Sequence, residues 1–157
     1  MSKYTVYNAS EWNLDRLGPY LSDVVHEMSR LADRFPGDVT TAALFQEFLS
    51  GKKTLWLILE GDKFVSIGMS TIRTVDATGQ RIFTLCDLAG RDVQKYKREL
   101  CEAVEAFAAK NGCHVTAVEG REGWKPLLAE FGYKPYAVLY RKVKDRAALA
   151  GSDGVVS

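Results

Sequence analysis

Residues 86–100, CDLAGRDVQKYKREL, are the part of the sequence best suited to bind an anion. An apolar strand pattern ends here and an amphipathic helix pattern begins near Val93, with Gly90 in the turn between them. The first turn of a helix offers free backbone N–H groups and the positive end of the helix dipole, which together favour phosphate. Arg91 and Lys95 add positive charge. The pattern therefore indicates phosphate-binding chemistry, with a single glycine to let a ligand approach the backbone.

The cysteines do not indicate a metal centre, because Cys86, Cys101 and Cys113 form no CxxC pair and no other spacing typical of metal ligands. We therefore expect no metal. The first ten residues, MSKYTVYNAS, lack the basic and then apolar layout of a signal peptide. An odd number of cysteines without an export signal favours a reducing compartment, and we expect a cytoplasmic protein.

Length and charge exclude several function classes. The 157 residues suit one domain with a real core, which we place at 1–145, followed by a flexible tail at 146–157. The formal net charge of +1 argues against a protein that coats nucleic acid. No apolar run is long enough to span a bilayer, so we expect no membrane segment.

The elements around the turn are predicted from periodicity. Strand patterns cover 3–9, 54–60, 64–75 and 81–88, and the middle pair is joined by a tight GDK turn. Helical spacing of apolar residues covers 14–31, where Gly18–Pro19 bends or divides the helix, and a second helix follows Thr40 or Thr41.

The second half of the chain alternates helices and strands. A helix from about Val93 ends at Asn111–Gly112, and it is followed by a strand at 113–120, a short helix at 121–133 and a last strand at 134–143. The predicted order is β-α-α-β-β-β-α-β-α-β. This order predicts a mixed α/β (α+β) single domain with a central sheet of about six strands and helices on both faces.

The order of elements over residues 4–143 resembles that of the GNAT family, the GCN5-related N-acetyltransferases. Three stretches resemble the family locally: the hairpin LILEGDKFVSIGMSTI, the helix and strand RELCEAVEAFAAKNGCHVTAVEG, and the closing LLAEFGYKPYAVLYRKV. The resemblance implies a V-shaped opening where the fourth and fifth strands separate, with acetyl-CoA bound there. It places the cofactor on the following residues: Leu88, Gly90, Arg91, Asp92, Val93, Gln94 and Lys95.

The sequence departs from the family pattern at three positions. Aligned through the later helix, the two loop glycines of the family fall on Lys95 and Lys97, whose long side chains would obstruct a pyrophosphate. The tyrosine that often serves as the general acid is replaced by Leu128, and Tyr133, Tyr136 and Tyr140 are the nearby phenols that remain. These departures indicate a degenerate acetyl-CoA motif.

The resemblance also suggests groups for catalysis and substrate binding. Asp87, at the end of the fourth strand, and Glu119, at the end of the fifth, flank the expected opening and are the candidates for a general base. Arg121 and Trp124 follow the fifth strand and are the candidates for a substrate pocket. Either carboxylate can equally be a solvated group at a strand end.

Two functions follow from these features. The first is an acetyl-CoA-dependent N-acetyltransferase that transfers acetyl to an amine of a small molecule or a protein. The second, which we favour, is a non-catalytic binding protein on the same scaffold. Residues 118–143 resemble GNAT-like proteins encoded by bacteriophages, which suggests a phage-associated protein in the host cytoplasm or the virion. A protein partner and an oligomer are both compatible with this second function.

Overall fold

The computed structural model of the protein describes residues 2–89, 91–120, 122–142 and 144. Within these residues, five strands form one sheet in the same order as they occur along the chain. The first four, β1 (Tyr4–Asn8), β2 (Thr54–Glu60), β3 (Lys63–Thr74) and β4 (Arg81–Leu88), pair antiparallel. The fifth, β5 (Val115–Val118), pairs parallel with β4 through a crossover that contains a helix. The predicted mixed α/β fold class is confirmed.

The helices are close to their predicted positions. The first predicted helix is divided at Gly18–Pro19 into α1 (Leu14–Leu17), the 3₁₀ turn η2 (Gly18–Tyr20) and α2 (Leu21–Arg34). A further helix, α3 (Thr41–Leu49), precedes β2, and the crossover helix is α4 (Val93–Lys110). The remaining short elements are η1 (Ala9–Glu11), η3 (Glu122–Trp124) and α5 (Lys125–Ala129).

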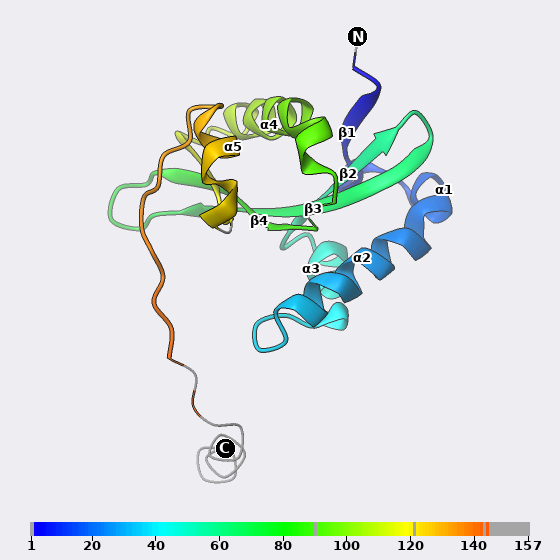
Figure 1. Cartoon of the computed structure of the whole chain (residues 1–157), viewed down its shortest axis with the longest axis horizontal. Helices are drawn as coiled ribbons and strands as arrows, with labels where there is room; N and C mark the ends of the chain where they lie inside the picture. Colours follow the sequence, from blue (N-terminus) through cyan, green and yellow to red (C-terminus); the bar gives the residue numbers. More distant parts are fainter. Residues whose placement is uncertain (1, 90, 121, 143, 145–157) are drawn as a thin grey trace.

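Helices cover both faces of the sheet, as predicted (Figure 1). The alternation in β2 produces this arrangement, because successive side chains of a strand point to opposite faces. Leu55, Leu57 and Leu59 pack in one cluster with α2 and α3, whereas Trp56 and Ile58 pack in a second cluster with α4. The sheet therefore separates two apolar layers.

Local signals set the ends of the elements. The Thr40 hydroxyl accepts a hydrogen bond from Ala43 N at 3.0 Å and caps α3. Gly61 has φ +61° in the turn between β2 and β3, and Gly112 has φ +71° just after α4. Both glycines therefore adopt the left-handed conformation that other residues rarely adopt.

The predicted sixth strand is wrong. The described part of it, residues 134–142, belongs to no strand and extends away from the body of the protein (Figure 1). The apolar alternation there predicts β-structure only if a sheet edge is available for pairing, and in this chain the segment does not meet β5. The predicted tail, 146–157, lies outside the described residues.

Candidate functional site

The expected opening lies where β4 and β5 cease to pair. Their register runs from Ile82 opposite Val115 to Leu85 opposite Val118, and Glu119 N donates a hydrogen bond to Leu85 O at 3.0 Å. One residue later, β4 has a bulge. Ser70 of β3 is opposite Leu85 and Met69 is opposite Asp87, so Cys86 is the extra residue. A bulge bends a strand and leaves one residue out of the ladder, which marks the point where β4 turns away from β5.

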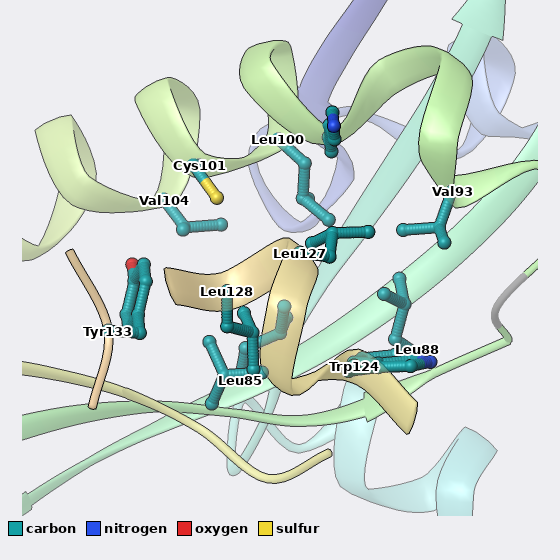
Figure 2. Close-up of a pocket in the computed structure, with 12 residues that line it drawn as sticks. Leu85, Leu88, Val93, Leu100, Cys101, Val104, Trp124, Leu127, Leu128 and Tyr133 are labelled. Atoms are coloured by element: carbon teal, nitrogen blue, oxygen red, sulfur yellow. The ribbon is translucent and has the colours of Figure 1, made fainter. Parts of the chain in front are cut away.

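The indole of Trp124 occupies the space between these strand ends. A Cβ placed on Gly120 would lie 2.8 Å from Trp124 Cε3, so the ring packs directly on the backbone that follows β5. Figure 2 shows the indole beside Leu88, at the end of β4. The sequence candidate Trp124 therefore lies at the opening, whereas Arg121 lies outside the described residues.

A small apolar cavity of about 20 Å³ remains behind Trp124. Figure 2 shows side chains from α4 above it and from α5 and β4 below it. Leu128, at the family's tyrosine position, is one of these lining residues. The others are Leu85, Leu88, Val93, Lys97, Leu100, Cys101, Val104, Val118, Trp124, Leu127 and Tyr133.

The carboxylate of Asp87 is bound to a lysine that the sequence analysis did not identify. Lys53 Nζ lies 2.9 Å from Asp87 Oδ2 and 3.4 Å from Glu47 Oε1, and the Lys53 and Asp87 side chains are largely buried. Burial of Lys53 opposes its charge, but the hydrogen bond to Asp87 and the surrounding negative charge outweigh burial, so the pKa of Lys53 is raised. Asp87 is thus one half of an ion pair.

Glu119 is exposed at the end of β5, where its backbone N–H continues the ladder to β4. The Cys86 thiol lies next to Asp87. Burial is the largest cause that raises the pKa of Cys86 to about 12, and the charges of Asp87 and Glu119 add to it. Cys86 is therefore a neutral thiol at physiological pH. Its Sγ lies 3.4 Å from Met69 O and 3.5 Å from Asp87 Oδ2, and either oxygen can accept the single S–H.

The turn before α4 is held mainly by Arg91. Its Nε lies 3.1 Å from Glu27 Oε1 on α2, and its carbonyl accepts a hydrogen bond from the Tyr96 hydroxyl at 2.8 Å. Asp92 follows with φ +55°, a left-handed conformation, and its side chain makes no capping bond to the helix. Glu27, like Lys53, was not predicted from the sequence. Gly90 lies outside the described residues.

The other residues predicted to contact a cofactor lie at the start of α4. Val93 is half-buried, whereas Gln94 and Lys95 are exposed, and Lys95 Nζ lies 3.9 Å from Asp92 Oδ1. Lys97 is one turn into the helix, and its Nζ lies 2.6 Å from Glu130 Oε2, just after α5. Arg91, Lys95 and Lys97 thus each have a carboxylate partner within the chain.

The tyrosines that remain near the family's acid position differ in environment. The Tyr133 hydroxyl donates to Glu105 Oε2 at 2.8 Å, and burial, followed by this hydrogen bond, raises the pKa of Tyr133. Tyr136 and Tyr140 are exposed on the segment that leaves the body. Among these three residues, Tyr133 alone lines the cavity.

Within the described residues, no group of three or more His, Cys, Asp or Glu side chains has an arrangement that could hold a metal ion. Among the described helices, none is long and apolar enough to cross a membrane.

A larger hollow, of about 250 Å³, lies away from the strand opening, between α1, η2 and the β2–β3 turn. Tyr7, Trp12 and Tyr20 line it, and the guanidinium of Arg16 lies 4.0 Å from the centre of the Trp12 ring. This cation–π contact places a positive side chain of the protein itself within the hollow.

Comparison with known proteins identifies the fold. The sequence matches no protein family profile and no curated protein sequence. The structure is similar to glucosamine-6-phosphate N-acetyltransferase from Arabidopsis thaliana, with a TM-score of 0.62, 12% identity, and coverage of 90% of this chain and 99% of that one. It is also similar to a transcriptional regulator from Bacillus halodurans, with a TM-score of 0.62, 19% identity, and coverage of 90% and 99%.

A third similar structure is a GNAT family acetyltransferase from Staphylococcus aureus. Its TM-score is 0.58 at 12% identity, and the alignment covers 92% of this chain and 100% of that chain. These similarities extend over nearly the whole length of each protein, and at such identities they concern the fold. The chain therefore has the fold of the GNAT acetyltransferases.

Proposed function

We propose that this protein is a non-catalytic binding protein with a GNAT fold, in which the acetyl-CoA site no longer functions. The main support is the indole of Trp124 packed on Gly120 in the strand opening. The cavity left there, about 20 Å³, has room for roughly one water molecule. Pockets for drug-sized ligands measure roughly 300–1,000 Å³. The residues present in the opening therefore do not fit the pantetheine arm of acetyl-CoA.

The charges in the turn give a second, independent support. A pyrophosphate would have to compete with Glu27 for Arg91 and with Glu130 for Lys97. Glu27 would be harder to displace than Glu130, because the Glu27 side chain is only 3% exposed and a buried carboxylate needs its cationic partners. Removing Arg91 from Glu27 would therefore cost free energy that binding of the anion would have to offset.

The general-acid position and one of the two candidate bases point the same way. Leu128 has no ionisable group, and it packs in the cavity as an apolar side chain. Asp87 already binds the Lys53 ammonium, so it would have to lose that partner before it could accept a proton from a substrate amine. The general-acid position is thus occupied by a leucine, and one candidate base is engaged in an ion pair.

The resemblance of residues 118–143 to phage-encoded proteins extends the proposal. We place the chain among phage-associated proteins that act in the host cytoplasm or in the virion by binding another macromolecule, and the natural partner is a protein. The near-neutral charge of the chain favours a protein over a nucleic acid.

One observation favours the alternative of an acetyl-CoA-dependent N-acetyltransferase. The bulge at Cys86 lies at the divergence of β4 and β5, and bulges are frequent next to active sites. In this alternative the Trp124 side chain moves out of the opening, and Glu119, which is exposed, takes the proton from the amine.

Calorimetry with acetyl-CoA separates the two functions. We expect no binding tighter than about 1 mM, a free energy of about −4.1 kcal/mol, and no thermal stabilisation by the cofactor. Binding tighter than about 100 μM would overturn the proposal if Lys95→Glu weakens it and Lys63→Glu does not. Lys63 is a matched control, because it is also exposed but lies at the start of β3, in a different part of the fold.

A further inference from the structure

The hollow between α1, η2 and the β2–β3 turn, here called the aromatic hollow, is walled by three aromatic rings. The ring centres of Tyr7 and Trp12 lie 5.3 Å apart with a tilt of 55°, and those of Trp12 and Tyr20 lie 6.2 Å apart with a tilt of 46°. Because neighbouring rings are tilted and not stacked, they form adjoining walls, and the buried Leu59 lines the space with them. Figure 1 shows α1 far from α5, which borders the strand opening. The aromatic hollow is therefore a separate cavity.

Local structure holds these rings in place. The Asn8 side chain caps the 3₁₀ turn before Trp12 by accepting a hydrogen bond from Ser10 N at 3.1 Å. The Tyr20 hydroxyl donates to Asp62 O in the β2–β3 turn at 3.0 Å, which fixes the ring against the end of the hairpin. All three rings also pack against the buried cluster that the sheet shares with α2 and α3. The walls are thus formed in advance, so a ligand would lose little free energy in ordering them.

The guanidinium of Arg16 shows that these rings accept a cation. It lies 4.0 Å from the centre of the Trp12 ring and 5.4 Å from that of Tyr7. Cation–π attraction acts up to roughly 6 Å from a ring centre, and at exposed sites it is weak. Arg16 is exposed, and within the described residues it has no carboxylate as an ion-pair partner. Since only weak contacts hold the guanidinium, it can leave the rings to a stronger competitor.

The charges that line the hollow favour such a competitor. Asp15 and Asp62 line it, and both residues are exposed. In the part of the chain that the structure describes, neither carboxylate has a cationic partner. Two carboxylates and the single guanidinium of Arg16 leave the lining with an excess of negative charge. A second cation would therefore meet both an aromatic wall and unpaired carboxylates, and a guanidinium can bond a carboxylate through two N–H groups.

We propose that the aromatic hollow binds the guanidinium of an arginine side chain presented by a partner protein, and that Arg16 moves out as this side chain enters. A guanidinium is planar and weakly hydrated, and it stacks on aromatic faces. The hollow measures about 250 Å³, below the roughly 300–1,000 Å³ of pockets for whole drug-sized ligands, so it suits one side chain that enters from outside. The proposal goes beyond the proposed function, and it holds whether or not the strand opening binds a cofactor.

A titration with Nα-acetyl-L-arginine N-methylamide, followed by NMR of the three tryptophan indole N–H signals, tests the site. In Arg16→Gln we expect the Trp12 signal, assigned by its loss in Trp12→Phe, to shift with a dissociation constant of about 0.1–10 mM. The signals of Trp56 and Trp124 should not shift. The citrulline analogue has the same shape but no charge, and it should bind at least about tenfold more weakly. No shift of the Trp12 signal, or equal binding of the citrulline analogue, overturns the proposal.

Matched variants test the roles of the charged residues. Arg16→Gln should bind the probe at least about fivefold more tightly than the wild type, because it removes the internal competitor. Arg73→Gln, at an exposed arginine of β3, should leave the affinity unchanged. Asp15→Asn/Asp62→Asn should bind at least about fivefold more weakly, whereas Asp76→Asn, at an exposed aspartate between β3 and β4, should have no effect. Tighter binding absent from Arg16→Gln, or weaker binding absent from the double variant, refutes the proposed exchange.

Free L-arginine distinguishes a side chain of a partner protein from a small molecule. Its α-ammonium and carboxylate are absent from an arginine within a chain, so we expect it to bind no more tightly than the blocked probe. Binding of free L-arginine more than about tenfold tighter than the blocked probe would identify the occupant as a small molecule and overturn the assignment to a partner protein.

Discussion

The buried carboxylate of Glu27 provides a quantitative test of how the turn before α4 is held. Its side chain is 3% exposed on α2, with Arg30 Nη1 at 2.7 Å and Arg91 Nε at 3.1 Å. The two arginines are 36% and 45% exposed. Water can therefore solvate either arginine if Glu27 is lost, whereas Glu27 itself has little contact with water and depends on the two arginines.

This asymmetry fixes the order of the expected effects. Glu27→Gln removes the buried charge and keeps the shape, so we expect a loss of about 1 kcal/mol in the free energy of unfolding. The double variant Arg30→Ala/Arg91→Ala leaves a carboxylate buried without a cation, for which the expected loss is about 3–5 kcal/mol. The triple variant Glu27→Gln/Arg30→Ala/Arg91→Ala has no unpaired carboxylate. Its free energy of unfolding should be about 2 kcal/mol higher than that of the double variant.

Urea unfolding, monitored by circular dichroism, gives the free energy of unfolding of the wild type and of the three variants. The values can be compared if the free energy falls with urea concentration at the same slope in all four proteins. Arg73→Ala, at an exposed arginine of β3, controls for the loss of an arginine as such. A triple variant no more stable than the double variant would refute the reasoning, because the cost would then arise from lost arginine packing and not from an uncompensated carboxylate.

Three further predictions concern stability. Because burial raises the folded-state pKa of both Cys86 and Tyr96 to about 12, from 9.0 and 10.0, the folded protein keeps protons that the unfolded chain loses. The free energy of unfolding should therefore fall as the pH rises from about 9 to 12, as denaturant titrations at several pH values will measure. At the left-handed Asp92, Asp92→Ala should be less stable than Asp92→Gly by about 1 kcal/mol in thermal unfolding. Ser70→Ala should cost about 1–3 kcal/mol in urea unfolding, since Ser70 Oγ accepts a hydrogen bond from the buried Trp56 Nε1 at 2.8 Å.

Local signals allowed most of the fold to be predicted from the sequence. The division of the first helix at Gly18–Pro19 and the end of α4 at Asn111–Gly112 depend on residues adjacent in sequence. The strand predicted at 134–143 failed for a different reason. Alternation describes the side chains of a strand, but pairing depends on a sheet edge elsewhere in the chain.

The partners of the candidate site could not be predicted in the same way. Arg91 and Asp87 were identified as groups of interest, but their partners Glu27 and Lys53 are 64 and 34 residues away in sequence. No spacing rule connects such pairs, because the sheet register and the helix packing bring them together. Trp124 was placed near the opening from its position after β5, but only the packing on Gly120 shows how it fills that space.

The short parallel ladder between β4 and β5 has a consequence for local opening. β5 joins the sheet only from Val115 to Val118, and beyond Glu119 the packing of Trp124 holds the two strand ends together. Amide protons of β5 should therefore exchange with solvent sooner than those of β2, which has partners on both sides. Access to the strand opening is thus linked to partial unfolding at one edge of the sheet, so any ligand of this opening would compete with native structure.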